Sequence, residues 1–159
     1  MKRLLLLPLL LSLGLPVQAK ITKESVKVLE KAVLECDKYG HESCAARFLA
    51  MGGCSYAMAM NSDKEPIEAR EIGDEVFMMM MKGNKISSQI LWDENNKIKE
   101  NIKSEAIARM GFCKSTIKEV AIKKYKEKTG KVLEGDSLKR AVNGFSWVYL
   151  YDIEKLREE

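Results

Sequence analysis

The sequence predicts an all-α protein: a single-domain, disulfide-stapled helical bundle of five or six helices. Apolar residues recur at three- and four-residue spacing along nearly the whole chain, and the alternation typical of strands is almost absent. Four cysteines are available to crosslink the helices. The 159 residues include 27 basic residues, 23 acidic residues and one histidine, which excludes an extreme polyion and a histidine-rich metal site.

Residues 1–19 have the features of a secretory signal peptide. Basic residues at positions 2 and 3 precede an apolar run over Leu4–Leu15, and the small residue Ala19 ends the expected cleavage site. The apolar run is too short to cross about 30 Å of hydrocarbon, which takes about 20 helical residues. We therefore expect a protein exported to the periplasm or secreted, with no transmembrane span in the mature chain.

The mature chain, residues 20–159, is predicted to form one helical domain. Its length is typical of a single domain, and no linker rich in Pro, Gly or Ser divides it. Loss of the two basic residues of the leader lowers the net charge from +4 to +2. This small charge does not support nucleic-acid binding.

The first two predicted helices form a hairpin. One covers residues 23–38 and ends before Gly40, which can adopt the left-handed conformation that closes a helix. The other covers residues 43–60, and from Cys44 to Met60 only Arg47 and Ser55 are clearly polar. Because a helix that is apolar on all sides is a buried one, we place it at the centre of the bundle.

The third predicted helix begins at Pro66, whose fixed φ suits the first helical position, and ends at Gly83. Residues 86–92 are apolar but too short to assign to a helix or a strand from their pattern. Residues 93–96 are predicted to form a loop.

The C-terminal part is predicted to contain two more helices. A long helix covers residues 97–128, and its packed part ends near Ala121 because a lysine then enters the apolar stripe. The last helix starts after an N-cap at Asp136 and continues to the C-terminus. The aromatic run at 145–151 also allows a strand. Three aromatic residues here are assigned neither to the core nor to a contact surface: Trp147, Tyr149 and Tyr151.

Four cysteines in an exported domain predict two disulfides. Cys44 and Cys54 are ten residues apart on one predicted helix, about 15 Å by helical rise, so they cannot pair unless Gly52-Gly53 breaks the helix. Cys36 and Cys44 are equidistant from the turn at Gly40 and should face each other. This leaves Cys54 to pair with Cys113. No Cys-x-x-Cys motif is present, so we interpret both bonds as structural.

The cysteines of the second pair share the pattern Met-Gly-x-Cys, with Gly52 and Gly53 before Cys54 and Gly111 before Cys113. Helices normally pack 8–10 Å apart, whereas a disulfide needs Cα atoms about 4.4–6.8 Å apart. The glycines beside the two cysteines are therefore predicted to let the two helix backbones approach.

The block Gly-Asp-Ser-Leu at Gly135–Leu138 resembles the motif of the GDSL-type serine esterases, in which the serine is the nucleophile. The resemblance covers four residues. Those enzymes need a histidine late in the chain, within Asp-x-x-His, to accept the serine proton. Here the only histidine, His41, precedes Ser137, so we interpret the block as the start of a helix and assign no catalytic residue.

Methionines are the most distinctive residues of the mature chain. Thioethers favour Cu(I), so four of them form an alternative metal site: Met58, Met60, Met78 and Met81. Four consecutive methionines on a helix point about 100° apart, so at most two of residues 78–81 can serve one site. Core packing and contacts with a partner are the preferred interpretations of these adaptable side chains.

Basic residues are concentrated between positions 97 and 131, which predicts a surface for an anionic partner such as a membrane or an acidic polymer. The candidate basic face consists of Lys114, Lys118, Lys123, Lys124 and Lys126.

No nucleophile–base pair, phosphate-binding loop or metal-ligand cluster is recognisable, so we predict that the protein is not an enzyme and needs no cofactor. The preferred hypothesis is an exported helical module that binds an unidentified protein or an anionic envelope component. The alternative is a periplasmic, methionine-rich Cu(I)-binding protein.

Overall fold

The computed structural model describes residues 36–84 and 89–156, together with Lys27 and Lys31. This part of the chain contains helices and no strand, apart from one isolated bridge between Trp92 and Ile98, so the predicted all-α class is confirmed. The elements in chain order are η1 (Asp37–Tyr39), α3 (His41–Asn61), α4 (Pro66–Gly83), α6 (Glu100–Arg109), η2 (Met110–Cys113), α7 (Lys114–Thr129) and α8 (Gly135–Leu156).

The predicted signal peptide at 1–19 and most of the predicted first helix at 23–38 lie outside the described residues. The predicted count of five or six helices is not matched exactly by the described elements. The predicted starts and ends of the second and third helices agree with α3 and α4 to within two residues. Among the described helices, none combines the length and apolar character needed to cross a bilayer.

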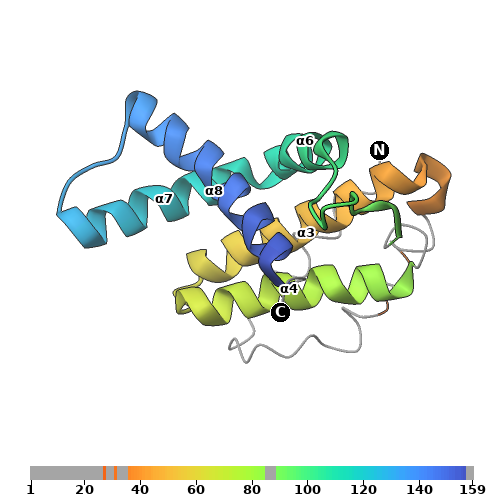
Figure 1. The fold of residues 1–159 in the computed structure, drawn as a ribbon. Coiled ribbons are helices and arrows are strands. Elements are labelled where there is room, and N and C mark those ends of the chain that lie inside the picture. Colours follow the sequence, from red (N-terminus) through yellow and green to blue (C-terminus); the bar gives the residue numbers. More distant parts are fainter. Residues whose placement is uncertain (1–26, 28–30, 32–35, 85–88, 157–159) are drawn as a thin grey trace.

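Helix α3 lies at the centre of the bundle, as predicted for residues 43–60. It contacts α4, α6, η2, α7 and α8. In Figure 1, α3 lies between α4 on one side and α6–α7 on the other, while α8 crosses in front of it. One apolar cluster takes side chains from all five of these α-helices, and its largest α3 members are Phe48 and Leu49, both without exposed surface.

The two helices of the α3–α4 pair approach most closely at Gly52 and Gly73. A Cβ atom at Gly52 would lie 2.9 Å from the Gly73 carbonyl oxygen, and a Cβ at Gly73 would lie 2.8 Å from the Gly52 oxygen. Tyr149 of α8 enters the same crossing, where its hydroxyl donates a hydrogen bond to the Gly73 carbonyl oxygen at 3.4 Å. Burial raises the pKa of this phenol well above its ordinary value, so Tyr149 keeps the proton that it donates.

Both predicted disulfides are present. Cys36–Cys44 has a Cα–Cα distance of 5.4 Å across the turn at Gly40, which adopts a φ of +85°. Cys54–Cys113 joins α3 to η2 with a Cα–Cα distance of 5.8 Å. The prediction that glycines let the two backbones approach holds for Gly53 and is wrong for Gly111. A Cβ at Gly53 would lie 2.6 Å from Met110, whereas a Cβ at Gly111 would meet no atom within 4 Å.

The prediction of a single helix over residues 97–128 is wrong. Residues 97–99 precede α6, and Ile98 pairs with Trp92 instead of starting a helix. The four residues of η2 then separate α6 from α7. A 3-10 turn has fewer residues per turn than an α-helix, so η2 places both Met110 and Cys113 on the buried side, where Cys113 reaches Cys54.

The last predicted helix is confirmed as α8, and residues 145–151 are helical. Asp136 lies in the first turn of α8 rather than before it, so the predicted N-cap was wrong by position. Beyond Val120, the side chains of α7 are half-buried or exposed, as the predicted end of packing near Ala121 requires. The end of α7 and the start of α8 therefore form an arm that projects from the bundle (Figure 1).

A substitution at the helix crossing should destabilise the fold. In Gly52→Ala, the new methyl group would lie 2.1 Å from the Tyr149 hydroxyl, so we expect the free energy of unfolding to fall by about 2 kcal/mol. Gly144→Ala is the matched control, because a Cβ there meets nothing within 4 Å and alanine favours helix by up to about 1 kcal/mol. Urea unfolding should therefore change in opposite directions for the two variants. Equal changes in the free energy of unfolding of the two variants would contradict the close approach of α3 and α4 at Gly52.

The two disulfides should differ in their contributions to stability. The bonds close loops with sequence separations of 8 and 59 residues, for which chain entropy gives about 2.5 and about 4 kcal/mol. Cys54→Ala with Cys113→Ala should therefore lower the urea midpoint more than Cys36→Ala with Cys44→Ala. A non-reducing peptide map that links Cys36 to Cys54 would overturn the pairing itself.

Candidate binding surface

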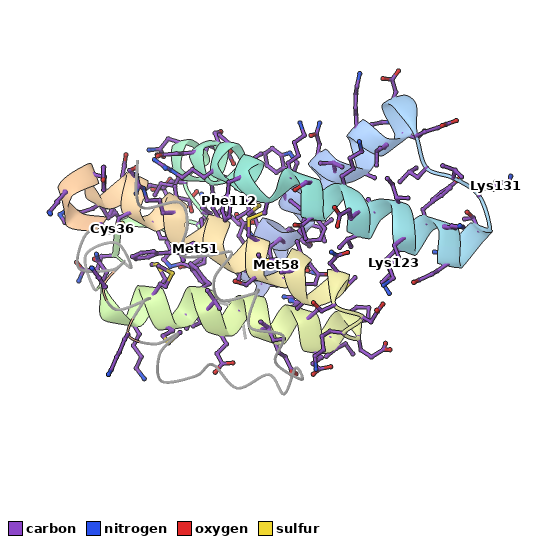
Figure 2. All side chains as sticks on the ribbon, turned by 180° about the vertical axis from the view of Figure 1, so that it is seen from behind. Cys36, Met51, Met58, Phe112, Lys123 and Lys131 are labelled. Carbon is purple, nitrogen blue, oxygen red and sulfur yellow. A yellow bond between two sulfur atoms is a disulfide. The ribbon has the colours of Figure 1, made fainter. Side chains whose placement is uncertain are left out.

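The outer side of α8 exposes a set of large apolar side chains. Trp147, Val148 and Tyr151 are 49%, 56% and 52% exposed. The opposite side of the same helix is in the core, where Tyr149 and Leu150 have no exposed surface. In Figure 1, α8 lies in front of α3, and in Figure 2, seen from behind, it lies behind α3. None of the labelled elements covers its outer side.

Cations flank these aromatic residues. Lys155 Nζ lies 4.7 Å from the centre of the Tyr151 ring, and Lys103 Nζ lies 5.9 Å from the Trp147 ring. The sequence of α8 has no acidic residue between Asp136 and Asp152. We define the α8 face as the exposed residues on this side of the helix: Arg140, Asn143, Trp147, Val148, Tyr151 and Lys155.

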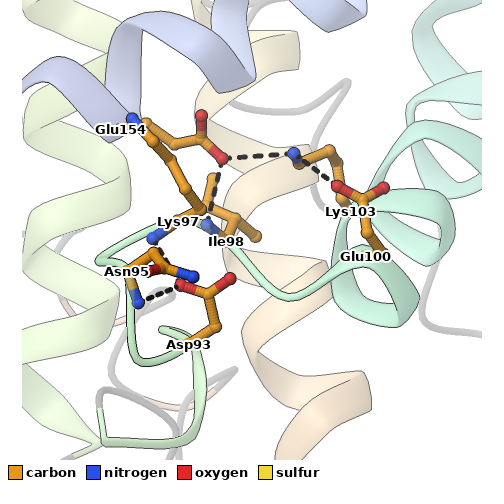
Figure 3. A network of polar contacts seen from close by, with 7 residues as sticks. All are labelled: Asp93, Asn95, Lys97, Ile98, Glu100, Lys103 and Glu154. Carbon is orange, nitrogen blue, oxygen red and sulfur yellow. Dashed lines mark hydrogen bonds and ion pairs between the residues drawn. The ribbon is translucent and has the colours of Figure 1, made fainter.

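Lys103 and Glu154 hold α8 against the loop that precedes α6 (Figure 3). The Glu154 carboxylate, which is 5% exposed, accepts a hydrogen bond from the Ile98 N–H at 3.0 Å and pairs with Lys103 at 3.2 Å. Lys103 also pairs with Glu100 at 2.9 Å. Burial alone would lower the pKa of Lys103, but the two carboxylates outweigh it and raise this pKa, so the ammonium stays charged. Both carboxylates near Trp147 are thereby engaged with a cation.

The loop itself is shaped by Asp93, as Figure 3 also shows. One oxygen of its carboxylate accepts hydrogen bonds from the backbone N–H groups of Asn95 and Lys97, at 2.8 and 2.9 Å. Such bonds from a side chain to the following backbone are typical of aspartate in turns. The predicted loop at 93–96 is confirmed, and it presents Ile98 to Glu154.

A shallow groove of about 210 Å³ lies beside the α8 face, between α8 and the α6–η2–α7 segment. Its walls combine apolar and polar surface in similar amounts, and exposed Lys114 lies on the α7 side. The lining residues include Ile107, Met110 and Ile117 on the other elements and Val142, Asn143 and Ser146 on α8.

The five lysines of the predicted basic face do not share one face. At 100° per residue, Lys114 and Lys118 are 40° apart around α7, whereas Lys123 is on the opposite side from Lys114. Lys123 pairs with Asp63 beyond the end of α3, and Figure 2 shows it pointing that way. Lys124 pairs with Glu127 at 3.1 Å. Lys126 is exposed farther along the arm, so of the five only Lys114 lines the groove.

The four methionines of the alternative copper site are not brought together. Met60 packs in a small cluster with Ala69 and Val120, whereas Met81 belongs to the main core. Because α3 and α4 are antiparallel and cross at Gly52 and Gly73, Met60 and Met81 lie near opposite ends of the pair, about 24 Å apart by helical rise. Met58 is half-buried, and Met78 is 57% exposed.

Ser137 and His41 are also separated. His41 begins α3 and Ser137 lies in the first turn of α8, and these two helix ends lie on opposite sides of the molecule in Figure 1. The hydroxyl of Ser137 is 3.5 Å from the guanidinium of Arg140. His41 is therefore not placed to accept the proton of Ser137, as the histidine of a GDSL-type esterase does.

A half-buried ionic cluster between α4 and α8 is a feature that the sequence did not reveal. Arg70 pairs with Asp152 at 2.8 Å and with Asp74 at 3.3 Å, and it donates a hydrogen bond to the Asp152 carbonyl oxygen at 3.1 Å. The second carboxylate oxygen of Asp74 is buried and makes no hydrogen bond within the described residues. Burial raises the pKa of Asp74 despite Arg70. The cluster thus fixes α8 to α4. Keeping Asp74 ionised in this position lowers the free energy of unfolding, because burial disfavours its charged form.

The sign of this shift gives a pH prediction. Because folding raises the pKa of Asp74, the folded chain binds this proton more tightly, and stability is lost as the pH rises from about 4 through the folded pKa. Asp74→Asn should remove that loss and raise the free energy of unfolding at neutral pH by up to about 1 kcal/mol. Asp152→Asn is the control, since loss of its 2.8 Å pair with Arg70 should lower stability. Urea unfolding measured across this pH range would contradict the assignment if Asp74→Asn is destabilising at neutral pH.

The α8 face was not among the predicted binding residues. Trp147 and Tyr151 at an i, i+4 spacing, in a stretch without acidic residues, were the available signal. Comparisons of this chain with protein-family models, with curated proteins and with solved structures found no match.

Proposed function

We propose that the protein is an exported, non-enzymatic binding module that holds an anionic partner on the α8 face. The observation that carries the proposal is the exposure of Trp147, Val148 and Tyr151 side by side on a helix with cations at both ends of the set. Large apolar side chains grouped on a surface mark interaction sites, and Trp and Tyr dominate the energetics of such sites.

Two further observations support an anionic partner. Arg140 and Lys155 are exposed and make no ion pair among the described residues, so their charges are available. The carboxylates beside Trp147, Glu100 and Glu154, are already paired with Lys103. Arg140 and Lys155 are therefore the charges of the α8 face that have no ion-pair partner in the described part of the chain, and they favour an anionic partner over a cationic one.

Export is supported by the two disulfides, which persist in oxidising compartments, and by the leader-like residues 1–19. A non-enzymatic role is supported by the separation of Ser137 from His41. Binding through a preformed helix face requires no reactive group.

Site-specific photo-crosslinking tests the proposal without assuming the identity of the partner. A benzophenone side chain at position 147 should give a crosslinked product in the native host. The same group at position 67 should give none, because Ile67 is an isolated apolar side chain on α4, 76% exposed. Absence of a product at 147, or equal products at both positions, would reject the α8 face as the binding surface.

A further inference from the structure

We propose that the anionic partner of the α8 face is the surface of a phospholipid bilayer. This inference rests on the proposed function and identifies its partner. Trp and Tyr rings have an apolar body and a polar tip, and they concentrate at the level of lipid headgroups. On the α8 face they occur with Val148 between them and with Arg140 and Lys155 at the ends, which is the composition of a helix that lies in a membrane interface.

The spacing of the cations favours an extended charged surface over a small ligand. Arg140 and Lys155 are fifteen residues apart on one helix, about 22 Å by helical rise. A single small anion cannot contact both side chains. A layer of anionic headgroups can, because it offers charges along the whole length of α8 while the aromatic rings between them enter the interface.

The same spacing argues against a second copy of this chain as the occupant. If two α8 faces packed antiparallel about Trp147 and Val148, Arg140 of one copy would oppose Lys155 of the other. Parallel packing would oppose Arg140 to Arg140 and Lys155 to Lys155. Both arrangements place cation against cation at the ends of the contact, which disfavours self-association.

The face is held rigid for such docking. Tyr149 is fixed in the crossing of α3 and α4, and Glu154 is bonded to Ile98 and Lys103. Helix α8 therefore does not have to refold on binding, and the loss of conformational entropy is limited to the exposed side chains.

Vesicle binding tests the inference, with protein recovered after export. We expect co-sedimentation with vesicles of phosphatidylcholine and phosphatidylglycerol, weaker binding as NaCl rises, and no binding to phosphatidylcholine alone. Neutral vesicles also detect any uncleaved leader, since its apolar run would bind both kinds. In a Trp92→Phe background, Trp147 is the only tryptophan, and its fluorescence should shift to shorter wavelength on binding.

Variants assign the binding to the α8 face. Trp147→Ala should weaken the partition coefficient at least about tenfold, and Arg140→Gln and Lys155→Gln about fivefold each. Ile67→Ala and Lys82→Gln, both exposed on α4, are the matched controls and should stay within about twofold of the parent. Far-UV circular dichroism and intact disulfides should confirm that every variant is folded.

Three outcomes would overturn the bilayer as partner: equal binding to neutral vesicles, no effect of Trp147→Ala, or equally tight binding to soluble polyglutamate. The crosslinking experiment separates this failure from failure of the proposed function. A protein product at position 147 without vesicle binding would retain the binding surface and reject the lipid.

Discussion

The close contact of Gly52, Gly73 and Tyr149 is the constraint on which the rest of the structure depends. The two glycines let the α3 and α4 backbones approach until a Cβ on either would lie under 3 Å from the other carbonyl oxygen. Tyr149 brings α8 into the same place through its hydroxyl. Once Tyr149 points inward, helical geometry turns Trp147 and Tyr151 about 200° away, to the outside. The crossing thus determines which side of α8 is exposed.

Polar contacts then fix the C-terminal turns of α8 from two sides. Arg70 on α4 holds Asp152 through its side chain and its backbone carbonyl, and Lys103 on α6 holds Glu154. Breaking the half-buried Arg70–Asp152 pair or the more deeply buried Lys103–Glu154 pair leaves a charge without its partner, so both contacts resist rotation of the helix. Toward its N-terminus, α8 instead pairs with α7 in the projecting arm (Figure 1). Trp147 and Tyr151 of the α8 face therefore lie next to the turns that these polar contacts hold, whereas Arg140 belongs to the arm.

Sequence patterns predicted the features that arise from local chemistry or chain distance. Gly40 and Pro66 mark helix ends through their own backbone preferences, and the disulfide pairing follows from the turn at Gly40 and the rise of one helix. The interruption at η2 was missed because the apolar stripe continues through it, so the pattern alone does not distinguish one bent segment from one straight helix. The prediction of one basic face was wrong because the number of lysines in a stretch of sequence does not tell on which side of the helix each one lies. Lys123, for example, lies opposite Lys114 and pairs with Asp63.

The α8 face was missed for a different reason, and that reason bears on function. Trp147, Tyr149 and Tyr151 occur in one aromatic run, and their pattern in the sequence left open which of them belong to the core and which to a contact surface. In the structure Tyr149 has no exposed surface, whereas Trp147 and Tyr151 are 49% and 52% exposed. Exposing a Trp and a Tyr to water gives up part of the apolar burial that stabilises a small domain, and a partner that covers them would recover it. The exposure of these two aromatic side chains is therefore the physical basis for placing the proposed binding surface there.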